Sequence, residues 1–182
     1  CTALILAGFG LKDSISKIMD YQYIDIYKYD MLIGLKNTLT NDEINDLVNN
    51  LEEKSEIETL TRVYMSSEAV KKENLEEDAQ ILVVNNMEEL DKVIKLKDVK
   101  SGEPLVLNDE EIILTDKLAQ LINAKKGDEI ILKDSDKNEY SVRVGAVTEH
   151  YISHYIYMTK NLYQKIFNEE ASTNILLCKY SE

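Results

Sequence analysis

The sequence has no tryptophan, one proline, six glycines and two cysteines among its 182 residues. Cys1 and Cys178 stand at opposite ends of the chain, so they provide neither a disulfide framework nor a four-ligand zinc site. Arginine is almost absent, with Arg62 and Arg143 as the two examples, and 34 acidic against 21 basic residues give a formal charge of −13. Because guanidinium groups and positive charge make most contacts with phosphates and bases, this composition argues against nucleic acid as a partner.

The chain also lacks the motifs of nucleotide binding and covalent catalysis. Gly8 and Gly10 (GFGLKD) have neither the third glycine nor the preceding strand of a dinucleotide-binding loop. A nucleophile elbow is missing, and carboxylate pairs such as Glu88 and Glu89 are expected to face solvent in so acidic a chain. The sequence therefore predicts no catalytic residue, no cofactor and no enzyme activity. Its 44% apolar and 30% charged residues predict a folded chain with a substantial core.

Two histidines raise the question of a metal site. His150 and His154 are four residues apart, and on a helix that spacing brings both rings to one face. Ile152 and Tyr155 favour a strand, in which four residues span about 13 Å, too far for two rings to share one ion. We therefore expect no metal here and place both histidines at a surface or an interface.

A second candidate metal site is a partial calcium loop. Asp134, Asp136 and Asn138 match its first three ligand positions. Glu139 stands where the loop needs its turn glycine, and Gly145 stands where it needs the bidentate Glu. A polar hairpin turn accounts for the segment, so no calcium ion is expected.

The first eleven residues, 1–11, carry no charge. They are too few to span a bilayer, which takes about 20 residues in helical form. Two interpretations stay open: the end of a longer membrane helix cut upstream, or an ordinary core element at the start of a domain. Apolar residues at helical spacing continue toward residue 27, and we expect them to form the buried face of one helix. They are Leu11, Ile15, Ile18 and Met19.

The remaining chain shows alternating signals for strands and helices, which predict an α+β fold with an open sheet and helices on one face. Helices are predicted to follow residues that can cap a first turn, at Thr40, Asn86, Thr115 and Thr159. Strands are predicted from β-branched and apolar runs at 29–35, 57–64, 79–84, 105–107, 111–114, 129–133, 139–147 and 174–179.

The only proline, Pro104, marks a change to shorter segments. We accordingly expect three units. Residues 1–27 form an N-terminal helix, residues 28–95 and 159–182 form the α+β part, and residues 96–158 form an inserted β-rich subdomain.

Tyrosine is the unusual component, with 11 tyrosines against 2 phenylalanines. They gather in two groups, Tyr21, Tyr23, Tyr27 and Tyr29, then Tyr151, Tyr155 and Tyr157. Tyrosine combines apolar area with a polar tip, which suits contact surfaces, although half-buried tyrosines along a helix and a strand are the simpler structural interpretation. The predicted contact residues for a partner or substrate are Tyr151, His154, Tyr155 and Tyr157.

Four stretches resemble the extracytoplasmic domain of MacB/FtsX-like ABC-transporter permeases, particularly those of low-GC Gram-positive bacteria. They occur in order along nearly the whole chain. The segment Thr115 to Ala119 followed by Lys126 to Asp128 is the more specific part of the resemblance. The stretches are Leu6 to Ile15 (LAGFGLKDSI), Tyr27 to Met31 (YKYDM), Ile113 to Leu132 (ILTDKLAQLINAKKGDEIIL) and Ala146 to Met158 (AVTEHYISHYIYM).

The resemblance implies a domain on the extracellular side of the cell membrane, held between two membrane helices, with a porter-like part and an inserted smaller part. It implies no catalytic residue, because a separate cytoplasmic ABC ATPase hydrolyses ATP in this family. It also implies a second permease domain or copy as a partner, and a peptide is a possible substrate for the acidic surface. A complete porter-like part is expected to continue beyond Glu182 with another helix and strand.

Two other functions stay open at this stage. A ligand-sensing extracytoplasmic domain of a membrane receptor would also follow a membrane helix and lack catalytic residues. A secreted hydrolase would need a deep pocket in which His150 or His154 meets a carboxylate.

Overall fold

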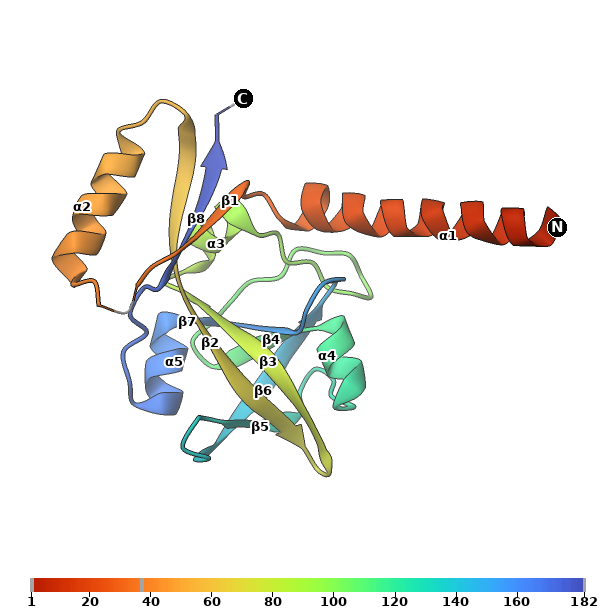
Figure 1. Ribbon diagram of the computed structural model, residues 1–182. Coiled ribbons are helices and arrows are strands. Elements are labelled where there is room, and N and C mark those ends of the chain that lie inside the picture. Colours follow the sequence, from red (N-terminus) through yellow and green to blue (C-terminus); the bar gives the residue numbers. More distant parts are fainter. Residues whose placement is uncertain (1, 37, 182) are drawn as a thin grey trace.

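Figure 1 shows the computed structural model, which describes residues 2–36 and 38–181. The helices are α1 (Thr2–Asp20), the π-helix η1 (Tyr21–Ile26), α2 (Asn41–Glu52), α3 (Met87–Val93), α4 (Asp116–Leu121) and α5 (Lys160–Phe167). The strands are β1 (Met31–Gly34), β2 (Ile57–Lys72), β3 (Leu75–Val84), β4 (Glu111–Thr115), β5 (Glu129–Lys133), β6 (Glu139–Thr148), β7 (Tyr155–Thr159) and β8 (Ile175–Tyr180).

The long strand β2 joins two parts of one sheet, whose strand order is β1-β8-β2-β3-β7-β4-β6-β5. The first half of β2 pairs with β8, and its second half pairs with β3. The second half also pairs with β5, where Val70 lies opposite Leu132. This last pairing closes β2, β3, β7, β4, β6 and β5 into a ring, from which β8 and β1 extend as an open wing.

The core of the ring is built by alternate residues of its strands. Ile81 of β3 pairs with Ile156 of β7, and both belong to one buried cluster together with Val70 and Leu132. Helices α4 and α5 contribute to the same cluster. The ring is stabilised in two ways, because a closed ring leaves no hydrogen-bonding edge and each buried aliphatic side chain contributes about 1.5–3 kcal/mol.

The other face of the same strands carries a second core. Leu82 and Val84 of β3 point away from the ring interior, because side chains alternate along a strand, and they pack with Leu90 and Val93 of α3. Ile26 of η1 belongs to this second cluster. A third, smaller core lies between α2 and the open wing of β1, β8 and the start of β2.

The predicted α+β fold class is confirmed, but the helices were expected on one face of the sheet and they divide between both faces. Helices α4 and α5 pack on the ring core, and α3 with η1 packs on the opposite face. The reason is that the alternate positions of β3 are apolar on both faces, so both faces need cover. Strand β2 belongs to the wing and the ring alike, and the division into 28–95 with 159–182 and 96–158 stays a prediction.

Three local predictions are wrong. Residues 105–107 form no strand, and Pro104 makes a single bridge to Lys97 instead. Thr115 precedes α4 but makes no side-chain cap, because its hydroxyl accepts the Tyr155 amide at 3.1 Å. The strand expected around the histidines begins at Tyr155, and Ser153 before it has a positive φ of 64°, which breaks an extended run.

The apolar stripe on α1 is also placed differently from the prediction. Leu11, Ile15, Ile18 and Met19 were expected to be buried, but 64%, 53%, 40% and 45% of their respective surfaces are exposed. Figure 1 gives the reason, because α1 projects away from the body and no other described element lies alongside it. Within residues 2–36 and 38–181, no helix combines the length and the hydropathy needed to cross a bilayer.

Candidate functional site

The candidate site is the junction where the N-terminal helix enters the body. Here α1 changes into the π-helical turn η1, and the Tyr27 amide donates to the Gln22 carbonyl at 2.8 Å, five residues back. The wider turn lets both Gln22 and Ile26 face inward, and both are buried. Such π-helical turns are rare and occur frequently at functional sites.

A buried hydrogen-bond pair fixes η1 to the loop before β7. The Gln22 amide nitrogen Nε2 lies 3.1 Å from Nε2 of His150, which is 128 residues away in the sequence. The Gln22 carbonyl oxygen Oε1 accepts the Tyr151 amide at 2.8 Å. The amide NH2 group can only donate, so Nε2 of His150 must accept and the ring proton must reside on Nδ1. His150 is therefore neutral in this arrangement.

Aromatic rings enclose His150 on several sides. The centroids of Tyr27, Tyr155 and Tyr157 lie 5.4, 5.2 and 6.3 Å from the His150 ring centroid. Tyr155 stacks on Tyr157 at 5.9 Å. Aromatic pairs at such distances add about 0.5–1.5 kcal/mol beyond the apolar area that they bury. The two tyrosine groups of the sequence thus meet around one histidine.

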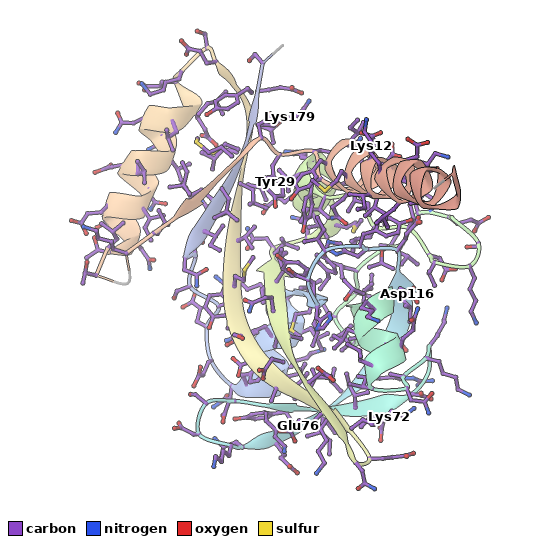
Figure 2. All side chains as sticks on the ribbon, turned by 45° about the vertical axis from the view of Figure 1, so that its right-hand side comes forward. Lys12, Tyr29, Lys72, Glu76, Asp116 and Lys179 are labelled. Atoms are coloured by element: carbon purple, nitrogen blue, oxygen red, sulfur yellow. The ribbon has the colours of Figure 1, made fainter. Side chains whose placement is uncertain are left out.

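Backbone hydrogen bonds continue the attachment after η1. The Lys28 amide donates to the Val93 carbonyl at 2.7 Å, and the Lys95 amide donates to the Ile26 carbonyl at 2.8 Å. Tyr27 bridges to Ile94 between them. The chain leaving η1 is therefore paired with the segment that follows α3, and Tyr29 lies where this chain enters the sheet (Figure 2).

Burial sets the protonation of this site. Burial lowers the pKa of His150 from 6.5 to about 4, against a smaller raising effect of the Ile152 carbonyl. Burial also raises the pKa of Tyr157 and of Tyr27, and it raises that of Tyr29 to about 12. All of these groups are neutral near pH 7, so the junction is an uncharged, hydrogen-bonded and aromatic contact.

The four predicted contact residues have different surroundings. Tyr151 is 41% exposed, and its ring centroid lies 6.2 Å from that of Tyr21 in a tilted arrangement. Its hydroxyl donates to the Glu149 carboxylate, which raises the pKa of Tyr151 to about 12. His154 and Tyr155 are half-buried. Tyr157 is fully buried, so its side chain belongs to the core and not to a surface.

Sequence reasoning missed the two central residues of the junction. His150 was expected at a surface or an interface, but it is 3% exposed within the folded chain. Gln22 carried a signal that was not used, since it continues the helical spacing of the apolar stripe through Ile18 toward Ile26. A polar residue in such a stripe indicates a buried partner, and the partner lies too far along the chain to be identified from the pattern.

The alternatives involving metal or hydrolysis find no support at this junction. The group facing His150 is the Gln22 amide rather than a carboxylate. Among the described residues, no group of three or more His, Cys, Asp or Glu side chains is arranged to hold a metal ion.

The fold matches a class of domains with known structures. The chain resembles the extracellular domain of the ABC-type transporter YknZ from Gram-positive bacteria, with a TM-score of 0.56 and 12% identity over 83% of this chain and 82% of that one. It also resembles the periplasmic region of MacB from Actinobacillus actinomycetemcomitans, with a TM-score of 0.53 and 16% identity over 83% and 73% of the two chains. No protein-family model and no curated protein matches the sequence.

The chain therefore has the fold of a MacB-like extracytoplasmic domain, and the resemblance read from the sequence is confirmed at the level of the fold. One of these two structures is thus an extracellular domain of an ABC-type transporter, and the other is the periplasmic region of MacB.

Proposed function

We propose that this chain is the extracytoplasmic domain of an ABC-transporter permease on the extracellular side of the cell membrane. The observation that supports it most is the likeness of the fold, over 83% of the chain, to two such transporter domains. In this proposal a separate cytoplasmic ABC ATPase hydrolyses ATP, and the domain handles or exports a peptide or another substrate outside the cell.

The junction suggests how motion would reach the domain. A helix transmits displacement along its axis when its end is held by a packed body. Gln22 and Ile26 are buried, while residues 11–20 of α1 are exposed. Movement of α1 would therefore pull first on the contact between Gln22 and His150 and on the backbone pairing beside Ile94.

The exposed apolar stripe of α1 and the exposed Tyr151 supply the proposed contacts with partners of this domain. Leu11, Ile15 and Ile18 would pack on a second permease domain or copy, because large apolar side chains in a row are costly to leave in water. Tyr151, His154 and Tyr155 stay the proposed contacts for a partner or a substrate, and they lie beside the junction.

Cysteine labelling of the full-length gene product in intact cells tests the location. Cys178 is fully buried and is left in place, Cys1→Ser removes the other thiol of these 182 residues, and any cysteine elsewhere in the gene product is replaced with serine. We expect a Ser135→Cys variant, in the exposed turn between β5 and β6, to react with a membrane-impermeant maleimide in intact cells. Labelling that occurs only after the cells are lysed would contradict an extracellular location.

An Ile15→Cys variant tests the coupling in the same background. We expect its labelling rate in isolated membranes to change by at least about twofold when ATP and vanadate trap the transporter, because α1 moves with the membrane helices. Ser135→Cys is the control whose rate should stay constant. A sensing domain of a receptor would pass the location test and show no response to ATP.

A further inference from the structure

A pocket of about 360 Å³ lies beside α4, near the loop that leads from the end of β6 to His150. Its walls are α4 with the loop that follows it, the segment 98–100, and the end of β6. Figure 2 marks Asp116 at one end of α4 and Lys72 beyond the other end. A volume of this size suits a small ligand rather than a folded partner.

The floor of the pocket is apolar. Ala119, Ala124, Val99 and Val147 line it, and the two alanines leave room that a larger side chain would fill. Ala119 is 4% exposed, which places it at the boundary between the pocket and the ring core. A ligand that fills this floor must carry an apolar body, because such a surface offers nothing to a purely ionic group.

The rim of the pocket is cationic, although the chain has a net charge of −13. Lys100, Lys125 and Lys126 are exposed around it, and none of the three forms an ion pair within the part of the chain that the structure describes. Their ammonium groups therefore remain available to an anion that enters from solvent.

The acidic side chains that line the pocket accept hydrogen bonds from neighbouring residues. Asp98 accepts the amides of Ser101 and Lys100 at 2.8 and 2.9 Å, and these bonds lower its pKa, as does the nearby ammonium of Lys126. Asp116 accepts the Gln120 side-chain amide at 2.8 Å. These bonds engage one oxygen of each carboxylate, Oδ1 of Asp98 and Oδ2 of Asp116, and so weaken the competition of both groups for the lysines.

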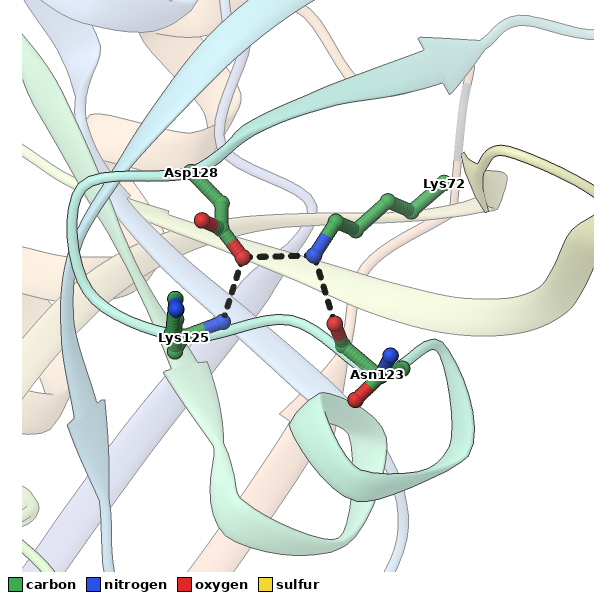
Figure 3. A network of polar contacts seen from close by, with 4 residues as sticks. All are labelled: Lys72, Asn123, Lys125 and Asp128. Carbon is green, nitrogen blue, oxygen red and sulfur yellow. Dashed lines mark hydrogen bonds and ion pairs between the residues drawn. The ribbon is translucent and has the colours of Figure 1, made fainter.

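The loop that carries two of the lysines is held rigid (Figure 3). Lys72 donates to the Asn123 carbonyl and to the Asp128 carboxylate, both at 2.6 Å, and Asp128 accepts the Lys125 amide at 3.0 Å. Asn123 and Gly127 have positive φ angles of 51° and 89°, which this network holds in place. The Lys72 ion pair also neutralises Asp128, the carboxylate that would otherwise repel an anion beside Lys125.

We propose that this pocket binds a small amphiphilic anion, with its apolar body on the alanine floor and its carboxylate or phosphate head between Lys125 and Lys126. Three features of this acidic protein point to this chemistry: a preformed apolar floor, lysines without ion pairs, and carboxylates that accept local hydrogen bonds. The inference does not depend on the transport role, since it rests on the geometry of the pocket alone.

Titration of the 182-residue chain with decanoate, followed by amide NMR shifts, tests the proposal. We expect saturable shifts centred on Ala119, Ala124 and Gly127, and a Kd that weakens with added salt. Decanol, which has the body without the charge, and inorganic phosphate, which has a charge without the body, should each bind at least about tenfold more weakly. Decanol binding as tightly as decanoate would overturn the proposal.

Two double variants of equal charge make the test specific. Lys125→Gln with Lys126→Gln should weaken decanoate binding at least about tenfold. Lys36→Gln with Lys54→Gln, on exposed residues in the segments before and after α2, should leave it within about twofold. Equal weakening by both pairs would show a general charge effect and would contradict the site.

Ala124→Leu provides an independent variant, because it fills the floor without changing the charge. We expect it to weaken decanoate binding while the NMR spectrum keeps its native dispersion. Unchanged binding would contradict the apolar part of the site. The anion could be the headgroup end of a membrane lipid or a free amphiphile, and vesicles of phosphatidylglycerol added to the wild-type chain separate these two sources. The same shifts with vesicles identify a lipid, and shifts with monomeric decanoate alone identify a free amphiphile.

Discussion

Replacing His150 with alanine is expected to lower the free energy of unfolding by about 3 kcal/mol. The substitution removes a buried ring that contacts Tyr27, Tyr155 and Tyr157, and it leaves the Gln22 amide without its acceptor. An unsatisfied buried donor costs about 1–3 kcal/mol, and the cavity adds to that cost. Urea unfolding at pH 7.5, followed by circular dichroism, measures the change.

His154→Ala is the matched control, because it removes the same side chain four residues away. His154 is half-buried and its backbone carbonyl, rather than its ring, accepts the Gln80 amide. We expect a loss below about 1 kcal/mol. Equal losses of unfolding free energy in the two variants would show that the burial of His150 among the tyrosines does not add to stability.

Acidification is expected to destabilise the fold by about 2 kcal/mol between pH 7.5 and pH 5 through His150 alone. The pKa of His150 is about 4 in the folded chain, and its ordinary value is 6.5. Between these two values the unfolded chain binds more protons than the folded chain, so stability is present above pH 6.5 and is lost as the pH falls toward 4. Burial is the cause, since a charged imidazole would lose its hydration.

The measurement compares the wild type with His150→Gln, which keeps a polar side chain but does not titrate. Unfolding free energies at half-unit steps from pH 7.5 to pH 5 should fall by about 2 kcal/mol more in the wild type than in the variant. Stopping at pH 5 keeps the carboxylates with lowered pKa values, such as Asp98 and Asp128, out of the titrated range. Parallel curves for the two proteins would contradict a buried neutral His150.

Local signals in the sequence predicted much of this fold. The capping box of Thr40 and Glu43 is present, with the Glu43 amide donating to Thr40 at 3.3 Å and the Thr40 amide to Glu43 at 2.8 Å. Asn86 and Thr159 cap their helices as predicted. These signals act within four residues, so they are readable without knowing the rest of the chain.

Features that depend on distant partners were not readable. The second half of β2 contains Glu68, Lys71 and Lys72, which no strand pattern favours, and it is a strand because β3 and β5 pair on either side of it. The closure of the ring by that pairing follows from the tertiary fold alone. Non-local contacts override weak local preferences, which explains why the predicted strand ended at residue 64 while β2 continues to Lys72.

The candidate site was predicted only in part, because its residues come from distant parts of the chain. The tyrosine groups were identified as contact candidates, and the structure brings Tyr21 to Tyr151 and Tyr27 to Tyr155 through His150. Composition can identify residues suited to contacts, but it cannot say that the two groups contact each other. The pairing of Gln22 with His150 spans 128 residues, so the local pattern that marks Gln22 cannot identify its partner.

The distance between α1 and the body, measured by pulsed EPR, tests the central claim that the junction holds the helix rigidly. Spin labels are placed at Ser16→Cys on α1 and Lys117→Cys on α4, both exposed positions, with Cys1→Ser and the buried Cys178 left unchanged. The account predicts one narrow distance distribution for this chain and a clearly broader one when Gln22→Ala is added. A broad distribution that Gln22→Ala leaves unchanged would contradict it.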